Sequence, residues 1–157
     1  NGKPMVVYVQ DLLDQWLGEA KARVILPITD PYVVHHGALG SFATAYLPAE
    51  VDIVEITEKL SNIEGILLVI NKSEAVKRFD LPADRIGDIV IISTENMTLG
   101  TSVDRHDLEA LKEPLRSHGG LTEQEVPFIV NRKIDLPEVP NLRNYDAFFY
   151  ASIAANT

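Results

Sequence analysis

The sequence contains no cysteine, which excludes disulfide bonds and thiolate metal ligands. Any metal must therefore be bound by His, Asp or Glu. The composition fits a reducing compartment, and we expect a cytoplasmic protein. The chain also lacks any apolar run close to the roughly 20 residues that cross a bilayer, and its start, Asn1-Gly2-Lys3-Pro4, has no signal-peptide character. We therefore expect no membrane partner.

The chain also has fewer basic than acidic residues. Fourteen Lys and Arg residues stand against 23 Asp and Glu residues, which gives a formal net charge of -9. The basic residues are scattered along the chain, so they form no stripe that could follow a phosphate backbone. A nucleic-acid partner is therefore not expected.

With 46% hydrophobic residues in 157, the chain can bury a core in one domain or in two small lobes.

The hydrophobic pattern predicts an α/β fold. We expect strands at 6–9, 22–26, 41–47, 66–70 and 89–92, and helices at 11–17, 49–63 and 73–79. The strand at 41–47 alternates large and small residues, which predicts one buried face. Ser73 is a plausible cap for the third helix, close to Asn71. Strands and helices alternate between 41 and 93, which predicts an α+β lobe with a mixed sheet and with its helices on one sheet face.

The residue composition changes after Gly100. A polar, turn-rich stretch is followed by Val126-Pro127-Phe128-Ile129-Val130, which we interpret as a core strand, and by a final helix at 144–154 capped by Asn144. We assign residues 20–100 to the α+β lobe, and residues 1–19 and 101–157 to part of a larger α/β core. The chain enters an apolar strand within a few residues of Asn1, as a segment of a longer polypeptide would.

The strongest local motif is Ser117-His118-Gly119-Gly120, followed by Val126-Pro127-Phe128-Ile129. A histidine next to two glycines can present its imidazole from a tight turn, which suits a metal ligand. A surface histidine that precedes the start of a helix has the same local sequence. The spacing leaves both interpretations open.

Two further stretches carry a family resemblance: Asp30-Pro31-Tyr32-Val33-Val34-His35-His36-Gly37 and Arg85-Ile86-Gly87-Asp88-Ile89-Val90-Ile91. Together with the His118 motif, they resemble phosphonoacetate hydrolases of the alkaline phosphatase superfamily, over nearly the whole chain. In that superfamily the histidine of this motif is the last protein ligand of a two-metal site, usually occupied by zinc. The resemblance implies that His118 is a metal ligand and that residues 20–100 form the cap lobe beside an alkaline phosphatase-like core.

The implied reaction is hydrolysis of the carbon–phosphorus bond of a small-molecule phosphonate, which gives acetate and phosphate. The family's nucleophilic threonine and its other Asp and His ligands have no counterparts in this sequence, so the resemblance assigns no catalytic residue to this chain. One imidazole binds zinc too weakly to build a catalytic centre. We expect this chain alone to be a C-terminal fragment that is inactive and does not retain zinc.

His35 and His36 are candidates for lining the substrate cavity from the cap, as their position in the family implies. Adjacent residues of an extended segment point to opposite sides, so the two do not readily chelate one ion, and packing or a loop contact is the alternative. Asp104-Arg105-His106-Asp107 could suggest a catalytic or metal site, but no nucleophile motif accompanies it. We interpret Asp104 and Asp107 as turn and cap residues.

Two other functions compete with the hydrolase. One is a phosphodiesterase or nucleotide pyrophosphatase of the same superfamily, which shares the His118 motif but is expected to differ around His35 and His36. The other is a stand-alone, ferredoxin-like module that binds a small molecule. Pairing of exposed sheet edges in a homodimer is also left open.

Overall fold

The computed structural model describes residues 5–27, 39–109, 118–131 and 142–155. The chain forms two compact units, Asn1–Gln124 and Glu125–Thr157. Each is considered by itself below.

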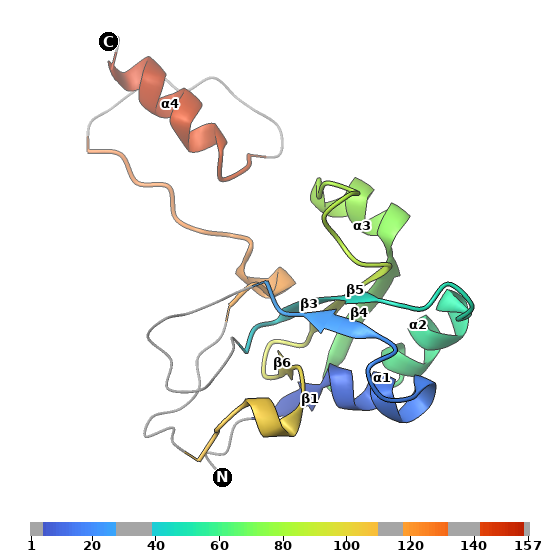
Figure 1. Cartoon of the computed structure of the whole chain (residues 1–157). Coiled ribbons are helices and arrows are strands. Elements are labelled where there is room, and N and C mark those ends of the chain that lie inside the picture. The colour runs from blue at the N-terminus through green and yellow to red at the C-terminus, as the bar shows by residue number, and fades with distance from the viewer. Residues whose placement is uncertain (1–4, 28–38, 110–117, 132–141, 156–157) are drawn as a thin grey trace. The chain divides into compact units, whose positions relative to one another are not determined.

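A four-stranded antiparallel sheet is the centre of the first unit (Figure 1). Its order is β2 (Arg23–Ile25), β3 (Phe42–Tyr46), β5 (Ile89–Ser93) and β4 (Ile66–Asn71). All five residues of β5 are buried, because this strand lies between β3 and β4 and carries apolar side chains on both faces. The four predicted strands are confirmed.

The two helices of the sheet region cover opposite faces of the sheet, so the prediction that they share one face was wrong. On one face, Ile56 and Leu60 of α2 (Ile53–Ser61) join a core with Ile89 and Ile91. On the other face, Ala75 of α3 (Lys72–Phe79) joins a core with Val90 and Ile92. Figure 1 shows α3 above the sheet, away from α1 and α2. Alternate residues of β5 point to opposite faces, and both faces are apolar, so each needs a cover.

The same arrangement corrects the expectation of one buried face for β3. Ala43, Thr44 and Ala45 are all buried, at 0%, 5% and 0% exposure. Small side chains in β3 allow close packing on both sides, which the alternation of large and small residues did not reveal.

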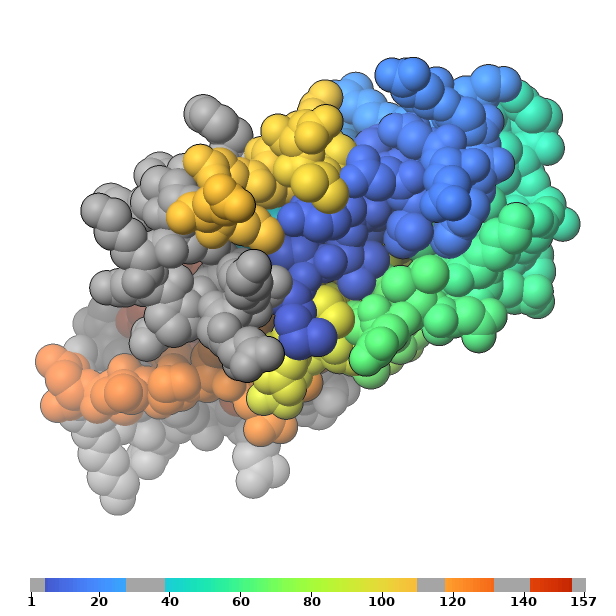
Figure 2. Space-filling model, turned by 90° about the horizontal axis from the view of Figure 1, so that it is seen from below, coloured from blue at the N-terminus to red at the C-terminus, as the bar shows by residue number. Residues whose placement is uncertain are grey.

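A second, two-stranded sheet pairs β1 (Val6–Tyr8) with β6 (Thr98–Gly100) in parallel, with Val7 opposite Leu99. Helix α1 (Val9–Leu17) follows β1 directly and ends at Gly18, as predicted. Residues near 100, yellow in Figure 2, lie beside the blue N-terminal segment although they are far apart in the sequence. The sequence did not predict β6, because three residues are too few to show a pattern. Parallel and antiparallel pairings thus occur in separate sheets, and the α/β class is confirmed.

In the second unit, α4 (Asp146–Ala155) confirms the predicted final helix, although it begins two residues after Asn144, the expected cap. The predicted core strand at 126–130 was wrong, since these residues form no strand and Val126 and Ile129 are 71% and 85% exposed. A strand needs a neighbour for its N–H and C=O groups, and the described residues of this unit contain none. Among all described residues, no helix combines the length and the apolar character that a membrane span requires.

Candidate functional site

The turn His118–Gly120 is held by hydrogen bonds at both ends. The backbone C=O of His118 accepts a hydrogen bond from Ser41 N–H at 3.0 Å, immediately before β3. The N–H of Gly120 donates to Glu123 Oε2 at 3.0 Å, across the short 3-10 helix η2 (Leu121–Glu123). Gly119 has φ +91°, a left-handed conformation that side chains rarely adopt. The glycine between these anchors therefore allows the tight turn.

Leu121, the residue that follows Gly120, anchors the turn to the hydrophobic core. Leu121 packs against the cluster of Ile70, Val90 and Ile92, on the sheet face that α3 covers. The His118 side chain is exposed. A fixed backbone with an accessible imidazole is the arrangement that a metal ligand needs.

Among the described residues, no group of three or more His, Asp or Glu side chains is placed to hold a metal ion, at His118 or elsewhere. His35 and His36, the substrate-cavity candidates, lie outside the described residues. Since a zinc site needs three or four ligands, this part of the chain can supply one of them. A zinc site that used His118 would need its other ligands from elsewhere.

The run Asp104–Asp107, considered from its sequence as a catalytic or metal site and set aside, contains a buried histidine, His106. It is 6% exposed, and its Nε2 accepts a hydrogen bond from Thr101 N–H at 3.0 Å. The Thr101 hydroxyl oxygen lies 3.1 Å from the same nitrogen, and the Tyr8 ring centroid lies 6.0 Å from the imidazole centroid. Burial and, to a smaller extent, the Asp11 carboxylate raise the pKa of Tyr8. His106 therefore fixes the chain after β6, and the predicted turn is confirmed by the 3-10 helix η1 (Val103–Arg105).

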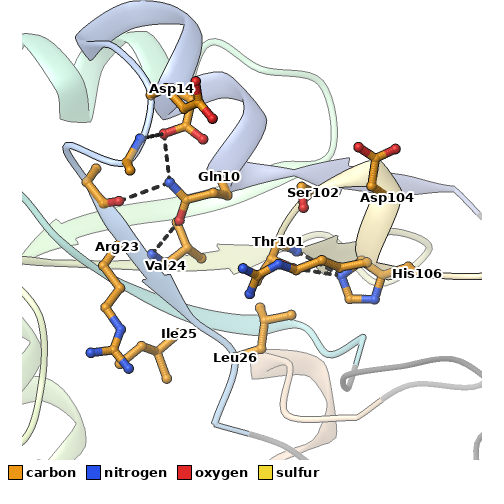
Figure 3. Close-up of a pocket in the computed structure, with 14 residues that line it drawn as sticks. Gln10, Asp14, Arg23, Val24, Ile25, Leu26, Thr101, Ser102, Asp104 and His106 are labelled. Atoms are coloured by element: carbon orange, nitrogen blue, oxygen red, sulfur yellow. Dashed lines mark hydrogen bonds between the residues drawn. The ribbon is translucent and has the colours of Figure 1, made fainter.

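A groove of about 1060 Å³ opens between α1, β2 and the segment after β6 (Figure 3). Gln10 lies in its wall and bridges two elements: its Oε1 accepts from Val24 N–H at 2.8 Å, and its Nε2 donates to Ala22 O at 3.0 Å. The side chains of Gln10 and His106 thus make hydrogen bonds to the backbone that hold the fold together. Arg23, Asp104 and Arg105 add exposed charges of both signs. His118 is not among the lining residues, so the groove and the candidate metal ligand are separate features.

No family model matches the chain. Comparisons with individual proteins and solved structures agree on one enzyme. A curated phosphonoacetate hydrolase from Penicillium oxalicum is 57% identical over 30 residues, which are 18% of this chain and 42% of that sequence. Two crystal structures of phosphonoacetate hydrolase from Sinorhizobium meliloti 1021, one in complex with phosphonoacetate and one with phosphonoformate, match with 69% identity and a TM-score of 0.86.

The match to the Sinorhizobium enzyme covers 98% of this chain but 38% of the enzyme. Such a match along almost the entire chain favours a part of a hydrolase over a stand-alone ferredoxin-like module. The two structural units and the His118 turn are therefore best understood as parts of a larger molecule. Over 98% of its length the chain is similar to part of a phosphonoacetate hydrolase, and it spans 38% of the length of the solved enzyme that it matches.

Proposed function

We propose that the protein to which this chain belongs hydrolyses phosphonoacetate to acetate and phosphate. In this reaction the C–P bond breaks, a P–O bond forms to the oxygen of water, and the carbon takes up a proton. The observation that supports the proposal is the 69% identity, over 98% of this chain, to a hydrolase whose crystal structures contain phosphonoacetate and phosphonoformate.

The part played by this chain is to supply one metal ligand, His118, from a turn that is fixed to the sheet. Its exposed imidazole and anchored backbone fit that role. Zinc, which the resemblance to the alkaline phosphatase superfamily implies, would neutralise charge on the phosphonate and activate a nucleophile when bound. The nucleophile and the other ligands come from the rest of the enzyme. His35 and His36 are proposed to line the substrate cavity from the cap.

The test uses the complete enzyme and phosphate release from phosphonoacetate. His118→Ala should lower kcat/KM by roughly 100-fold or more, because a lost metal ligand removes charge stabilisation at the phosphonate. Thr122→Ala, an exposed neighbour in η2, is the matched control and should keep activity near that of the wild type. Full activity of the His118 variant would refute the ligand assignment.

A second arm tests the substrate and the need for the rest of the enzyme. Release of product from a phosphodiester, with none from phosphonoacetate, would favour the related phosphodiesterase function. The 157-residue chain alone should release no phosphate in the presence of zinc, because one imidazole cannot form the metal centre.

A cytoplasmic location and a homodimer are further proposals. The absence of cysteine supports the first. For the second, β4 is an outer strand of the four-stranded sheet, with Leu67 50% exposed, and such an edge can pair with a second copy. Sedimentation of the complete enzyme, compared with a Leu67→Lys variant, tests whether this edge forms a dimer.

A further inference from the structure

The segment Gly40–Ser41 joins three parts of the first unit through backbone hydrogen bonds. The C=O of Gly40 accepts from Leu99 N–H of β6 at 2.7 Å, and the C=O of Ser41 accepts from Ser93 N–H of β5 at 3.0 Å. The N–H of Ser41 donates to the C=O of His118 at 3.0 Å. Two residues therefore connect both sheets to the turn that carries the candidate ligand.

Close packing reinforces this connection. A Cβ atom added at Gly120 would lie 3.3 Å from Ser41 Cβ and 3.5 Å from Ser41 Oγ. The first distance is tighter than ordinary carbon–carbon contact, so a side chain at position 120 would push the turn away from the start of β3. Ser41 itself is 7% exposed and cannot easily move aside.

The side chain of Ser41 and the missing side chain of Gly120 thus set how closely the His118 turn approaches the sheet. A shift there is transmitted to His118, two residues before Gly120, because its carbonyl is bonded to the same Ser41. Displacing a ligand by a fraction of an ångström weakens a metal site, since coordination distances are narrowly defined.

We propose that Ser41 and Gly120 are positioning residues for His118, and that their contact sets the zinc affinity of the complete enzyme. The inference rests on the proposed role of His118 as a zinc ligand. Neither residue contacts the metal in this scheme. Both act through the position of the His118 backbone.

The experiment measures zinc affinity of the complete enzyme by competition with a chelator, alongside its thermal unfolding. Gly120→Ala should weaken zinc binding about tenfold, the scale seen when a group that orients a ligand is lost. Combining it with Ser41→Gly removes the opposing Cβ and Oγ, so the double variant should recover to within about threefold of the wild type. Recovery of this kind is not expected from general loss of stability.

Gly18→Ala is the matched control. Gly18 has φ +100° at the end of α1, so alanine there strains the backbone far along the chain from the turn. It should lower the unfolding temperature while zinc affinity stays unchanged. If Gly120→Ala fails to fold, the double variant tests the positioning role by itself. It lacks the contact between positions 41 and 120, so it should fold and bind zinc almost normally.

Unchanged zinc affinity in Gly120→Ala, or a double variant as defective as the single one, would overturn the positioning role. These outcomes differ from failure of the proposed function, which His118→Ala reports: zinc binding unaffected by that substitution means that His118 is not a ligand. Loss of zinc in His118→Ala with normal binding in Gly120→Ala would reject the positioning role alone.

Discussion

The hydroxyl of Thr44 accepts a hydrogen bond from Gly87 N–H at 2.7 Å, inside the sheet. The same hydroxyl donates to the C=O of Ile89 at 3.1 Å, and Thr44 is 5% exposed. One side chain of β3 thus satisfies two backbone groups at the start of β5. Such a buried link has a high cost when one partner is lost.

Replacing Thr44 with valine should lower the free energy of unfolding by about 1–3 kcal/mol, because the shape is kept while Gly87 N–H is left buried without an acceptor. Urea unfolding of the 157-residue chain measures the change. Thr44→Ser keeps the hydroxyl and should lose less. Equal stability of the valine variant and the wild type would contradict the link.

Asp88 connects three segments and should give a pH-dependent stability. Burial raises its pKa, but the hydrogen bond from Leu47 N–H at 2.9 Å and the Lys72 ammonium at 3.2 Å outweigh it and hold the pKa below its ordinary value of 3.8. Since the folded-state pKa lies below the unfolded one, ionised Asp88 stabilises the fold above about pH 4. The contribution is lost as the pH falls through the folded-state pKa.

Asp88→Asn should therefore cost about 0.5–1 kcal/mol at pH 7, a value reduced by the partial exposure of the pair, and the cost should shrink as the pH falls through the folded-state pKa of Asp88. Thermal unfolding over this pH range measures the difference. Asp84→Asn is the control, since Asp84 and Arg85 are both 80% exposed and their nearest charged atoms are 3.9 Å apart. A constant difference for Asp88→Asn at every pH would contradict the pKa shift.

The N-terminus of α3 is capped by Asn71, whose Oδ1 accepts from Glu74 N–H at 3.0 Å. Asn71→Ala should destabilise the chain by about 1 kcal/mol, the usual value of a lost cap. Ser73→Ala is the informative comparison, because Ser73 was the residue expected to act as the cap. Chemical denaturation should show a clearly smaller effect for Ser73, and the reverse order would restore the original expectation.

The side-chain amide of Gln10 makes the hydrogen bonds that a neighbouring strand would make at the edge of β2. It accepts from Val24 N–H and donates to Ala22 C=O. Its Nε2 also donates to Asp14 Oδ1 at 2.9 Å. Gln10→Glu keeps the acceptor for Val24 but places a carboxylate against two oxygens, so the free energy of unfolding at pH 7 should fall by about 1–2 kcal/mol. Gln15→Glu, exposed on the same helix, should change little. Comparable losses in both variants would argue that charge alone is responsible.

The local elements of the first unit were largely predictable because each has a strong local signal. The apolar run of β5 and the spacing of Ile56 and Leu60 in α2 identify a strand and a helix whatever surrounds them. Asn71, in contrast, was passed over for Ser73, because either residue can cap a helix and only the position of the first turn selects between them.

Prediction failed where the answer depended on a distant partner. The segment 126–130 has the composition of a core strand, yet composition does not provide the neighbouring strand. The pairing of β1 with β6 joins residues more than 90 positions apart, and the cover on the second face of β3 and β5 depends on where α3 packs. Such contacts between distant segments leave no local pattern.

The sequence by itself determined the α/β class, most of the strands and helices, and the His118-Gly119-Gly120 motif, since each depends on neighbouring residues. Only the tertiary structure decided that the helices cover opposite sheet faces, that His106 is a buried structural group, and that the His118 turn is fastened to Ser41. The physical reason is that burial and long-range hydrogen bonds arise from packing between segments that are far apart along the chain.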